Sequence, residues 1–186
     1  VLRARSHKDK GEAARGRLQR EAQALAKLNH PNVVGVHDVG LHDGSVFVAM
    51  EFVEGQTFGD WIREAKRGWE TIVEVLAAAG DGLSAAHEQG LVHRDFKPDN
   101  IMIGTDGRVR VMDFGLARSG ESEGGETLDI PGLEDSRPSS LDESLTRTGA
   151  VVGTPAYMAP EQFSGLVVTA HSDQFAFCVT LHEALF

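Results

Sequence analysis

Cysteine and long apolar runs are the two features that this sequence lacks most clearly. Its 186 residues include one cysteine, Cys178, which excludes a disulfide framework or a thiolate zinc site within the chain and fits a thiol-reducing cytoplasm. No apolar stretch approaches the roughly 20 residues that span a bilayer, and the longest candidate, VFVAMEFV at 46–53, carries a glutamate. The chain opens with VLRARSHKDK, without an initiator methionine or the apolar stretch of a signal peptide, and we therefore expect a fragment.

Basic residues are also scarce relative to acidic ones. The chain has 18 Lys+Arg against 28 Asp+Glu, for a formal net charge of −10, which argues against a nucleic-acid partner. The excess of acidic residues is concentrated at 119–145, where eight acidic residues and one basic residue lie among many Ser, Gly and Pro residues. Such a segment buries too little apolar surface to offset its ordering entropy. We predict a mobile loop rather than a linker, because strongly patterned sequence resumes on both sides.

The hydrophobic pattern predicts an α+β chain. An amphipathic helix is predicted at about 9–28 and ends before Pro31. Two strands, 33–40 and 45–53, are joined by an Asp-Gly hairpin signal. The remaining predicted elements are a short helix after Gly55, a long helix from about Trp69 with Gly90 at its C-cap, two short strands around 101–103 and 108–112, and a helix from about 170 to 186. The last helix is apolar on nearly every side, as a buried helix would be.

Three short motifs carry the chemistry: HRDFKPDN at 93–100, DFG at 113–115 and APE at 159–161. An isolated Asp-Phe-Gly is more often a turn after a strand, so one motif alone is weak evidence. Together, in this order and with an asparagine five residues after the first aspartate, they resemble the signature set of protein kinases. The stretch 146–162 is similar to that of bacterial serine/threonine kinases. The resemblance extends through most of the chain and implies an α+β, two-lobe protein-kinase fold.

The resemblance implies transfer of phosphate from ATP to a serine or threonine hydroxyl of a protein. This reaction needs positioning and charge neutralisation more than covalent chemistry. Asp95 matches the carboxylate that orients the attacking hydroxyl, and Lys97, placed as in serine/threonine kinases, matches the cation on the transferring phosphate. Asn100 and Asp113 match the two magnesium ligands, and their hard oxygen atoms are the kind that Mg²⁺ prefers.

Other positions match the nucleotide site and the internal supports of the family. Glu21 matches the helix glutamate that pairs with the ATP-binding lysine, and Met50 matches the gatekeeper. Glu51 and Val53 match the hinge, whose backbone would bind adenine, and we expect Met102 to line the nucleotide site. The stacked side chains of the family's internal spine correspond here to Leu25, Val36, His93 and Phe114. Asp173 matches the buried aspartate that supports the catalytic loop in the family.

Regulation is expected in the activation segment, 113–161. Thr146 and Thr148 match positions that such kinases autophosphorylate, and a phosphate there could bind Arg94 through charge-assisted hydrogen bonds. Thr154 matches the threonine that contacts the catalytic Asp and Lys and helps exclude tyrosine. The acidic stretch described above lengthens this segment. We interpret it as a tolerated insertion rather than as a device that repels acidic substrates or holds the loop off the cleft.

The resemblance assigns 1–186 to one partial kinase domain. Residues 1–53 match a remnant of the N-terminal lobe with its helix, and 54–186 match the hinge and the C-terminal lobe up to the family's helix F. We expect the glycine-rich phosphate loop and the strand lysine to precede this chain, and the arginine that pairs with the APE glutamate, Glu161, to follow it. Without them, we expect the 186 residues alone to transfer phosphate poorly or not at all, although the whole protein is an active kinase.

Two other functions compete with this interpretation. A pseudokinase or scaffold binds partners without chemistry, but the complete set of four catalytic residues disfavours it. A small-molecule phosphotransferase of related fold is disfavoured by the Gly-Thr-Pro and APE stretch, which builds a peptide platform in the family. The expected cofactors are ATP and Mg²⁺, and the expected partner is a protein with a Ser/Thr acceptor. The catalytic part is expected in the cytoplasm, with a membrane anchor elsewhere in a full-length form left open.

Overall fold

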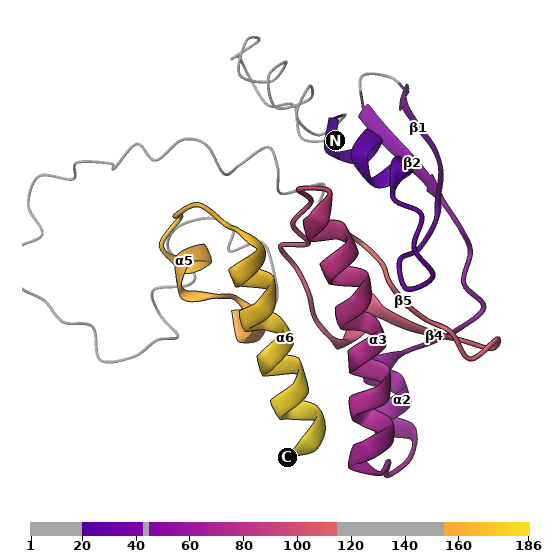
Figure 1. Ribbon diagram of the computed structural model, residues 1–186, viewed down its shortest axis with the longest axis vertical. Helices are drawn as coiled ribbons and strands as arrows, with labels where there is room; N and C mark the ends of the chain where they lie inside the picture. The colour runs from indigo at the N-terminus through magenta and orange to yellow at the C-terminus, as the bar shows by residue number, and fades with distance from the viewer. Residues whose placement is uncertain (1–19, 43–44, 115–154) are drawn as a thin grey trace, which may run out of the picture.

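The computed structural model describes residues 20–42, 45–114 and 155–186 of the chain. Figure 1 shows a smaller part, made of the first helix and a strand hairpin, above a larger part built around two long helices. Several predictions lie outside the described residues: the acidic loop at 119–145, the roles of Thr146, Thr148 and Thr154, the first helix before residue 20, the Asp43-Gly44 turn and Gly115 of the DFG motif.

The smaller part has the helix and hairpin that the sequence predicts. Residues 20–27 are helical, with Ala22 and Leu25 buried on one face. Strands β1 (Val36–His42) and β2 (Ser45–Met50) then pair antiparallel. The predicted second strand is too long by three residues, because residues 51–54 leave the hairpin and connect the two parts without regular structure. We call 51–54 the hinge.

Two helices follow the hinge. Strand β3 (Gly55–Thr57), which the sequence does not predict, leads into α2 (Phe58–Glu64), where the Thr57 hydroxyl caps the helix by accepting a hydrogen bond from Asp60 N–H. Helix α3 (Trp69–Glu88) buries the predicted apolar stripe. The C-cap is Gln89, one residue before the predicted position, and Gly90 follows it with a φ of 72°, the left-handed conformation that favours glycine just after a helix. The buried residues of this stripe are Ile72, Leu76, Ala79, Leu83 and Ala86.

A three-stranded sheet supports the loop that carries the HRD motif. Strands β4 (Ile101–Gly104) and β5 (Val109–Val111) form a hairpin, and β3 pairs with the other edge of β4. A parallel bridge between Val33 and Val111 joins this sheet to the segment after the first helix. The HRD loop therefore lies between the end of α3 and the start of β4, with rigid elements on both sides.

Helix α6 (Ala170–Leu185) lies beside α3, as Figure 1 shows. Apolar residues on nearly every side are typical of a buried helix, but only one face of α6 is buried in this structure. Ala176 and Thr180 are buried, whereas Phe175 is 41% and Phe186 is 95% exposed. The physical reason is that α6 packs mainly against α3 and the short helix η3 (Pro155–Tyr157), which cover one face. Within the described ranges, no helix is both long and apolar enough to cross a membrane.

Candidate active site

A buried aspartate holds the HRD loop in place. Asp173, in the first turn of α6, is 1% exposed. Its carboxylate accepts hydrogen bonds from His93 N–H at 2.7 Å and Arg94 N–H at 2.8 Å, and its Oδ2 lies 2.8 Å from His87 Nε2. Since a buried carboxylate must be hydrogen-bonded, these contacts fix the loop backbone. They confirm the predicted role of Asp173 as the support of this loop.

The predicted catalytic residues of this loop lie around one carboxylate. Lys97 Nζ is 3.1 Å from Asp95 Oδ2. Asn100, at the end of the short helix η1 (Pro98–Asn100), donates from Nδ2 to the backbone oxygen of Asp95 at 2.7 Å and contacts its Oδ2 at 3.4 Å. The side chains of Asp95 and Lys97 are 23% and 19% exposed, so the cluster is accessible to a ligand while its geometry is held.

The fourth predicted catalytic residue, Asp113, follows β5, and its neighbour in the chain contacts Asn100. The N–H of the preceding residue, Met112, donates to the backbone oxygen of Asn100 at 2.9 Å. Asp113 is exposed and has a φ of 55°, a left-handed conformation that costs energy in a non-glycine residue and is common at functional sites. Burial lowers the pKa of the nearby His93 imidazole, and the charges of Asp95 and Asp113 are among the interactions that oppose this shift. The two carboxylates therefore act on one common neighbour.

The donor set fits a magnesium ion bound to nucleotide phosphates. Because Asn100 uses Nδ2 for the contacts to Asp95, its Oδ1 is the oxygen that it can offer to a ligand. Together with the exposed carboxylate of Asp113, it would supply two hard oxygen donors, and Mg²⁺ would take its other ligands from phosphate and water oxygens. The part of the chain that the structure describes has no group of three or more His, Cys, Asp or Glu side chains arranged to hold a metal on its own.

The predicted internal spine is assembled. The rings of His93 and Phe114 lie 4.7 Å apart between centroids, Leu25 and Phe114 share one buried cluster, and Val36 packs against it. His93 is fully buried, and its Nε2 hydrogen-bonds the backbone oxygen of Met112 at 2.9 Å. With its pKa lowered by burial, His93 is a neutral structural ring, which agrees with the prediction that it belongs to the spine.

Glu21 and Arg94 pair with each other across the two parts of the molecule. The guanidinium is bidentate, with Nη1–Oε2 and Nη2–Oε1 distances of 3.1 Å, and the side chains are 29% and 18% exposed. The resemblance assigns each residue another partner: the ATP-binding lysine for Glu21 and an activation-loop phosphate for Arg94. The sequence alone does not predict this pair, because its members are 73 positions apart.

The predicted nucleotide-binding residues lie along the hinge and on β4. Met50, which ends β2, is 41% exposed, and Glu51 and Val53 follow it. The N–H of Glu51 donates to the backbone oxygen of Gly35 at 2.8 Å, so its carbonyl is the group that this residue can offer to adenine. Met102, in β4, is half-buried and lies opposite Arg110 of β5.

Three contacts around the APE motif were not predicted from the sequence. Gln162, in helix α5 (Pro160–Phe163), donates to the backbone oxygen of Arg94 at 2.9 Å and links this motif to the HRD loop. Glu161 accepts from the Ser172 hydroxyl at 2.5 Å, a hydrogen bond that lowers its pKa. Tyr157 donates to Glu183. Each contact joins residues distant in the chain, and no local sequence signal reports it.

The two-part α+β fold, with an HRD loop followed by a hairpin that leads to Asp113 and Phe114, is the architecture of protein kinases. The protein kinase domain family matches residues 2–186, and the chain belongs to this family. Among curated relatives, the chain is 37% identical over 174 residues to serine/threonine-protein kinase PknB of Mycobacterium tuberculosis, over 91% of this chain and 25% of that protein. It is 39% identical over 175 residues to serine/threonine-protein kinase pkn3 of Myxococcus xanthus, over 91% and 29%.

A solved structure agrees with this assignment. The kinase domain of Mycobacterium tuberculosis PknI superposes with a TM-score of 0.65 and 28% sequence identity, over 91% of this chain and 56% of that domain. The chain thus has the kinase fold in a shorter form than the solved domain. It spans only 25% to 29% of the length of the two curated relatives.

Proposed function

We propose that the protein is a serine/threonine protein kinase that transfers the γ-phosphate of ATP to a hydroxyl group of a protein. The observation that carries this proposal is the Lys97–Asp95–Asn100 cluster, in which an ammonium group at 3.1 Å and an amide at 3.4 Å meet at one carboxylate. The names of the relatives PknB and pkn3 as serine/threonine kinases support it. The free cysteine Cys178 suits a catalytic part that faces the cytoplasm.

The cluster has the chemistry that phosphoryl transfer requires. Asp95 accepts a hydrogen bond from the substrate hydroxyl and orients its oxygen for attack. Lys97, held beside Asp95, offsets negative charge on the transferring phosphoryl group. Asn100 and Asp113 hold Mg²⁺, which neutralises phosphate charge when it is bound. Each side chain contributes position and charge, and none forms a covalent intermediate.

The hinge and β4 form the adenine side of the site. The Glu51 carbonyl and the Val53 amide are the groups proposed to hydrogen-bond adenine, because the Glu51 amide already donates to Gly35. Met50 and Met102 supply apolar and polarisable surface, which suits a flat ring. Glu21 completes the site when it pairs with the family's ATP-binding lysine.

The acceptor is proposed to be a protein segment. A cavity of about 200 Å³ beside the catalytic loop is lined by Pro98 and Asp99 of that loop together with Tyr157 and Glu183. We propose that it receives one side chain of the acceptor segment. Lys97, two positions after Asp95, and Thr154 are the residues by which we propose that serine and threonine are accepted and tyrosine is excluded.

A labelled-ATP assay tests the proposal on the protein in its full natural length. We expect transfer to serine or threonine peptides, but not to tyrosine peptides or small-molecule acceptors. Asp113→Ala should lower kcat by about 100-fold or more, as the loss of a catalytic group usually does. Asp81→Ala removes the same charge from an exposed position on α3 and should leave kcat unchanged.

Other outcomes of this assay identify the competing functions. A full-length protein that labels nothing and binds nucleotide independently of Mg²⁺ is a scaffold, and one that labels only small molecules is a different phosphotransferase. The 186 residues alone should label peptides poorly, since they do not include the glycine-rich loop and the strand lysine that the resemblance assigns to the phosphates of ATP. That expectation would be contradicted if the short chain labelled peptides strongly and Asp113→Ala abolished the labelling.

We further propose that phosphorylation of Thr146 or Thr148 activates the enzyme by taking Arg94 away from Glu21. The bidentate Glu21–Arg94 pair supports this, because it occupies both residues that the active state needs. A phosphate carries nearly two negative charges and three acceptor oxygens, so it competes well with one carboxylate for a guanidinium. Glu21 is then released to bind the ATP-binding lysine.

A further inference from the structure

A buried arginine connects the β4–β5 hairpin to the hinge. Arg110 is the middle residue of β5 and is 3% exposed. Its guanidinium is bidentate to Asp106 in the turn of the hairpin, with an Nη2–Oδ2 distance of 2.7 Å and an Nη1–Oδ1 distance of 3.2 Å. Gly104 leaves the space for this pair, since a Cβ atom there would lie 2.4 Å from Asp106 Oδ1 and 2.9 Å from Arg110 Nη1.

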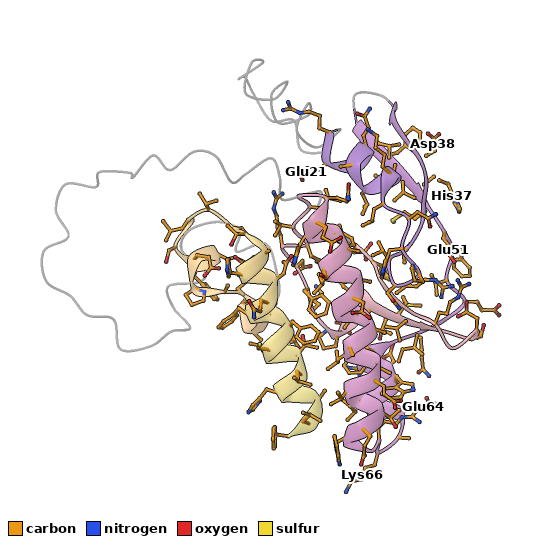
Figure 2. All side chains as sticks on the ribbon, in the orientation of Figure 1. Glu21, His37, Asp38, Glu51, Glu64 and Lys66 are labelled. Atoms are coloured by element: carbon orange, nitrogen blue, oxygen red, sulfur yellow. The ribbon has the colours of Figure 1, made fainter. Side chains whose placement is uncertain are left out.

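The same guanidinium also reaches the hinge. Arg110 Nη2 lies 3.4 Å from Oε1 of Glu51, and Oε2 of Glu51 accepts from Gly35 N–H at 3.4 Å. Figure 2 shows Glu51 between the β1–β2 hairpin and the β4–β5 hairpin. A second contact follows nearby, from Thr105 N–H to the backbone oxygen of Glu54 at 2.8 Å. The hinge is therefore attached to the β4–β5 hairpin through both a side chain and the backbone.

Stability alone does not account for this arrangement. Burying the Arg110 guanidinium costs desolvation free energy that its attraction to the two carboxylates must offset, and because Asp106 and Glu51 are 41% and 36% exposed, solvent weakens that attraction. The contact fixes the orientation of the groups, because a planar guanidinium that binds two carboxylates can adopt few orientations relative to them. The hydrogen bond to Asp106 raises the pKa of Arg110, and the charge of Glu51 adds to this effect, so the guanidinium keeps its charge at physiological pH.

We propose that Arg110 is a positioning residue of the nucleotide site, which holds Glu51 so that the hinge presents its backbone to adenine in one place. This inference rests on the proposed function, in which Glu51 and Val53 bind adenine. Arg110 touches neither nucleotide nor acceptor in this account. Its loss should therefore weaken nucleotide binding while the phosphoryl-transfer step and acceptor binding stay as they are.

The test compares two arginines of the same hairpin in the full-length protein. Arg108 also pairs with Asp106, at 2.7 Å, but its side chain is 60% exposed, so Arg108→Met is the matched control for Arg110→Met. Titration calorimetry with MgADP gives the Kd, and steady-state assays give the KM for ATP, the KM for peptide, and kcat. We expect Arg110→Met to raise the Kd for MgADP and the KM for ATP about five- to tenfold, as coupled neighbours typically do. Arg108→Met should change neither, and both variants should keep kcat and the peptide KM.

A second set of variants ties the effect to the hinge. In a Glu51→Gln background, Arg110→Met should have a much smaller effect on the MgADP Kd, and Arg110→Lys should recover part of the affinity. If Arg110→Met unfolds the protein, Arg110→Lys and Glu51→Gln carry the same comparison. Equal MgADP affinity in Arg110→Met and Arg108→Met, or an equal loss in kcat and peptide KM, overturns the inference. Wild-type protein that binds no MgADP overturns the proposed function itself, so the two failures are distinguishable.

Discussion

At the scale of single residues, the loop that carries the chemistry owes its shape to groups that take no part in the reaction. Asp173 accepts hydrogen bonds from His93 N–H and Arg94 N–H, and the φ of 66° at Arg94 turns the chain toward Asp95. Such a conformation in a non-glycine residue persists only where surrounding contacts determine it. Asp173 and the Gln162 contact to Arg94 provide them.

Most residues of the candidate site were predictable, whereas several of their partners were not. Asp95, Lys97 and Asn100 lie within one motif, so short-range spacing alone brings them together. The pairing of Glu21 with Arg94 and that of Arg110 with Glu51 join distant segments. Each depends on how the two parts of the molecule meet, which no sequence window contains.

His93 gives a prediction about pH. Burial lowers its pKa below the ordinary value of 6.5, so below that pH the unfolded chain binds a proton that the folded chain does not, and stability is lost as the pH falls. We expect the free energy of unfolding to drop between pH 7.5 and 5.5, by at most about 1.4 kcal/mol per pH unit for one such group. Urea titrations across this range should show a shallower drop for His93→Phe.

The matched control for this prediction is an exposed histidine. His37 lies on β1 and is exposed, as Figure 2 shows, so His37→Gln should keep the pH dependence of the wild-type protein. A His93→Phe variant with the same pH dependence as wild type would show that His93 does not account for the loss.

At the scale of elements, the sequence predicts well the helices and strands that have a clear hydrophobic period. It predicts poorly the features that depend on contact with another element. The stripe of α3 and the glycine at its C-terminus are local signals, and the observed helix follows them. Strand β3 is short and lacks any alternating pattern, and it exists because Gly55, Gln56 and Thr57 pair with β4. The one-sided burial of α6 likewise reflects which elements surround it rather than its own composition.

Two glycines of α3 make a matched test of packing. A Cβ atom at Gly82 would lie 2.3 Å from the backbone oxygen of Asn32, whereas one at Gly80 would lie 3.4 Å from the ring of Phe177. We expect Gly82→Ala to destabilise the protein by about 1–3 kcal/mol, because the segment at 30–34 must shift. Gly80→Ala should stabilise it by up to about 1 kcal/mol through helix propensity. Thermal unfolding of both variants decides this, and equal effects would contradict it.

At the scale of the whole molecule, a few contacts hold the smaller part against the larger one. They include the Val33–Val111 bridge, the Arg110–Glu51 contact and the Glu21–Arg94 pair. The first belongs to the backbone and is independent of ligands. The other two are ion pairs, and only Glu21–Arg94 has a proposed competitor, the phosphate of the activation segment. Phosphorylation should therefore change how the two parts are coupled without unfolding either.

A double-mutant cycle measures this coupling in the two states of the enzyme. In protein treated with phosphatase, Glu21→Gln and Arg94→Met should be non-additive in the free energy of unfolding, with a coupling of about 1–3 kcal/mol for a partly buried bidentate pair. In protein phosphorylated on Thr146 or Thr148, as established by phosphopeptide mapping, the coupling should fall close to zero because Arg94 binds the phosphate instead. Phosphorylation should raise kcat in the wild type and have little effect in Arg94→Met. An active sample with both threonines unmodified, or equal coupling in the two states, would mean that Arg94 does not exchange partners and that activation has another cause.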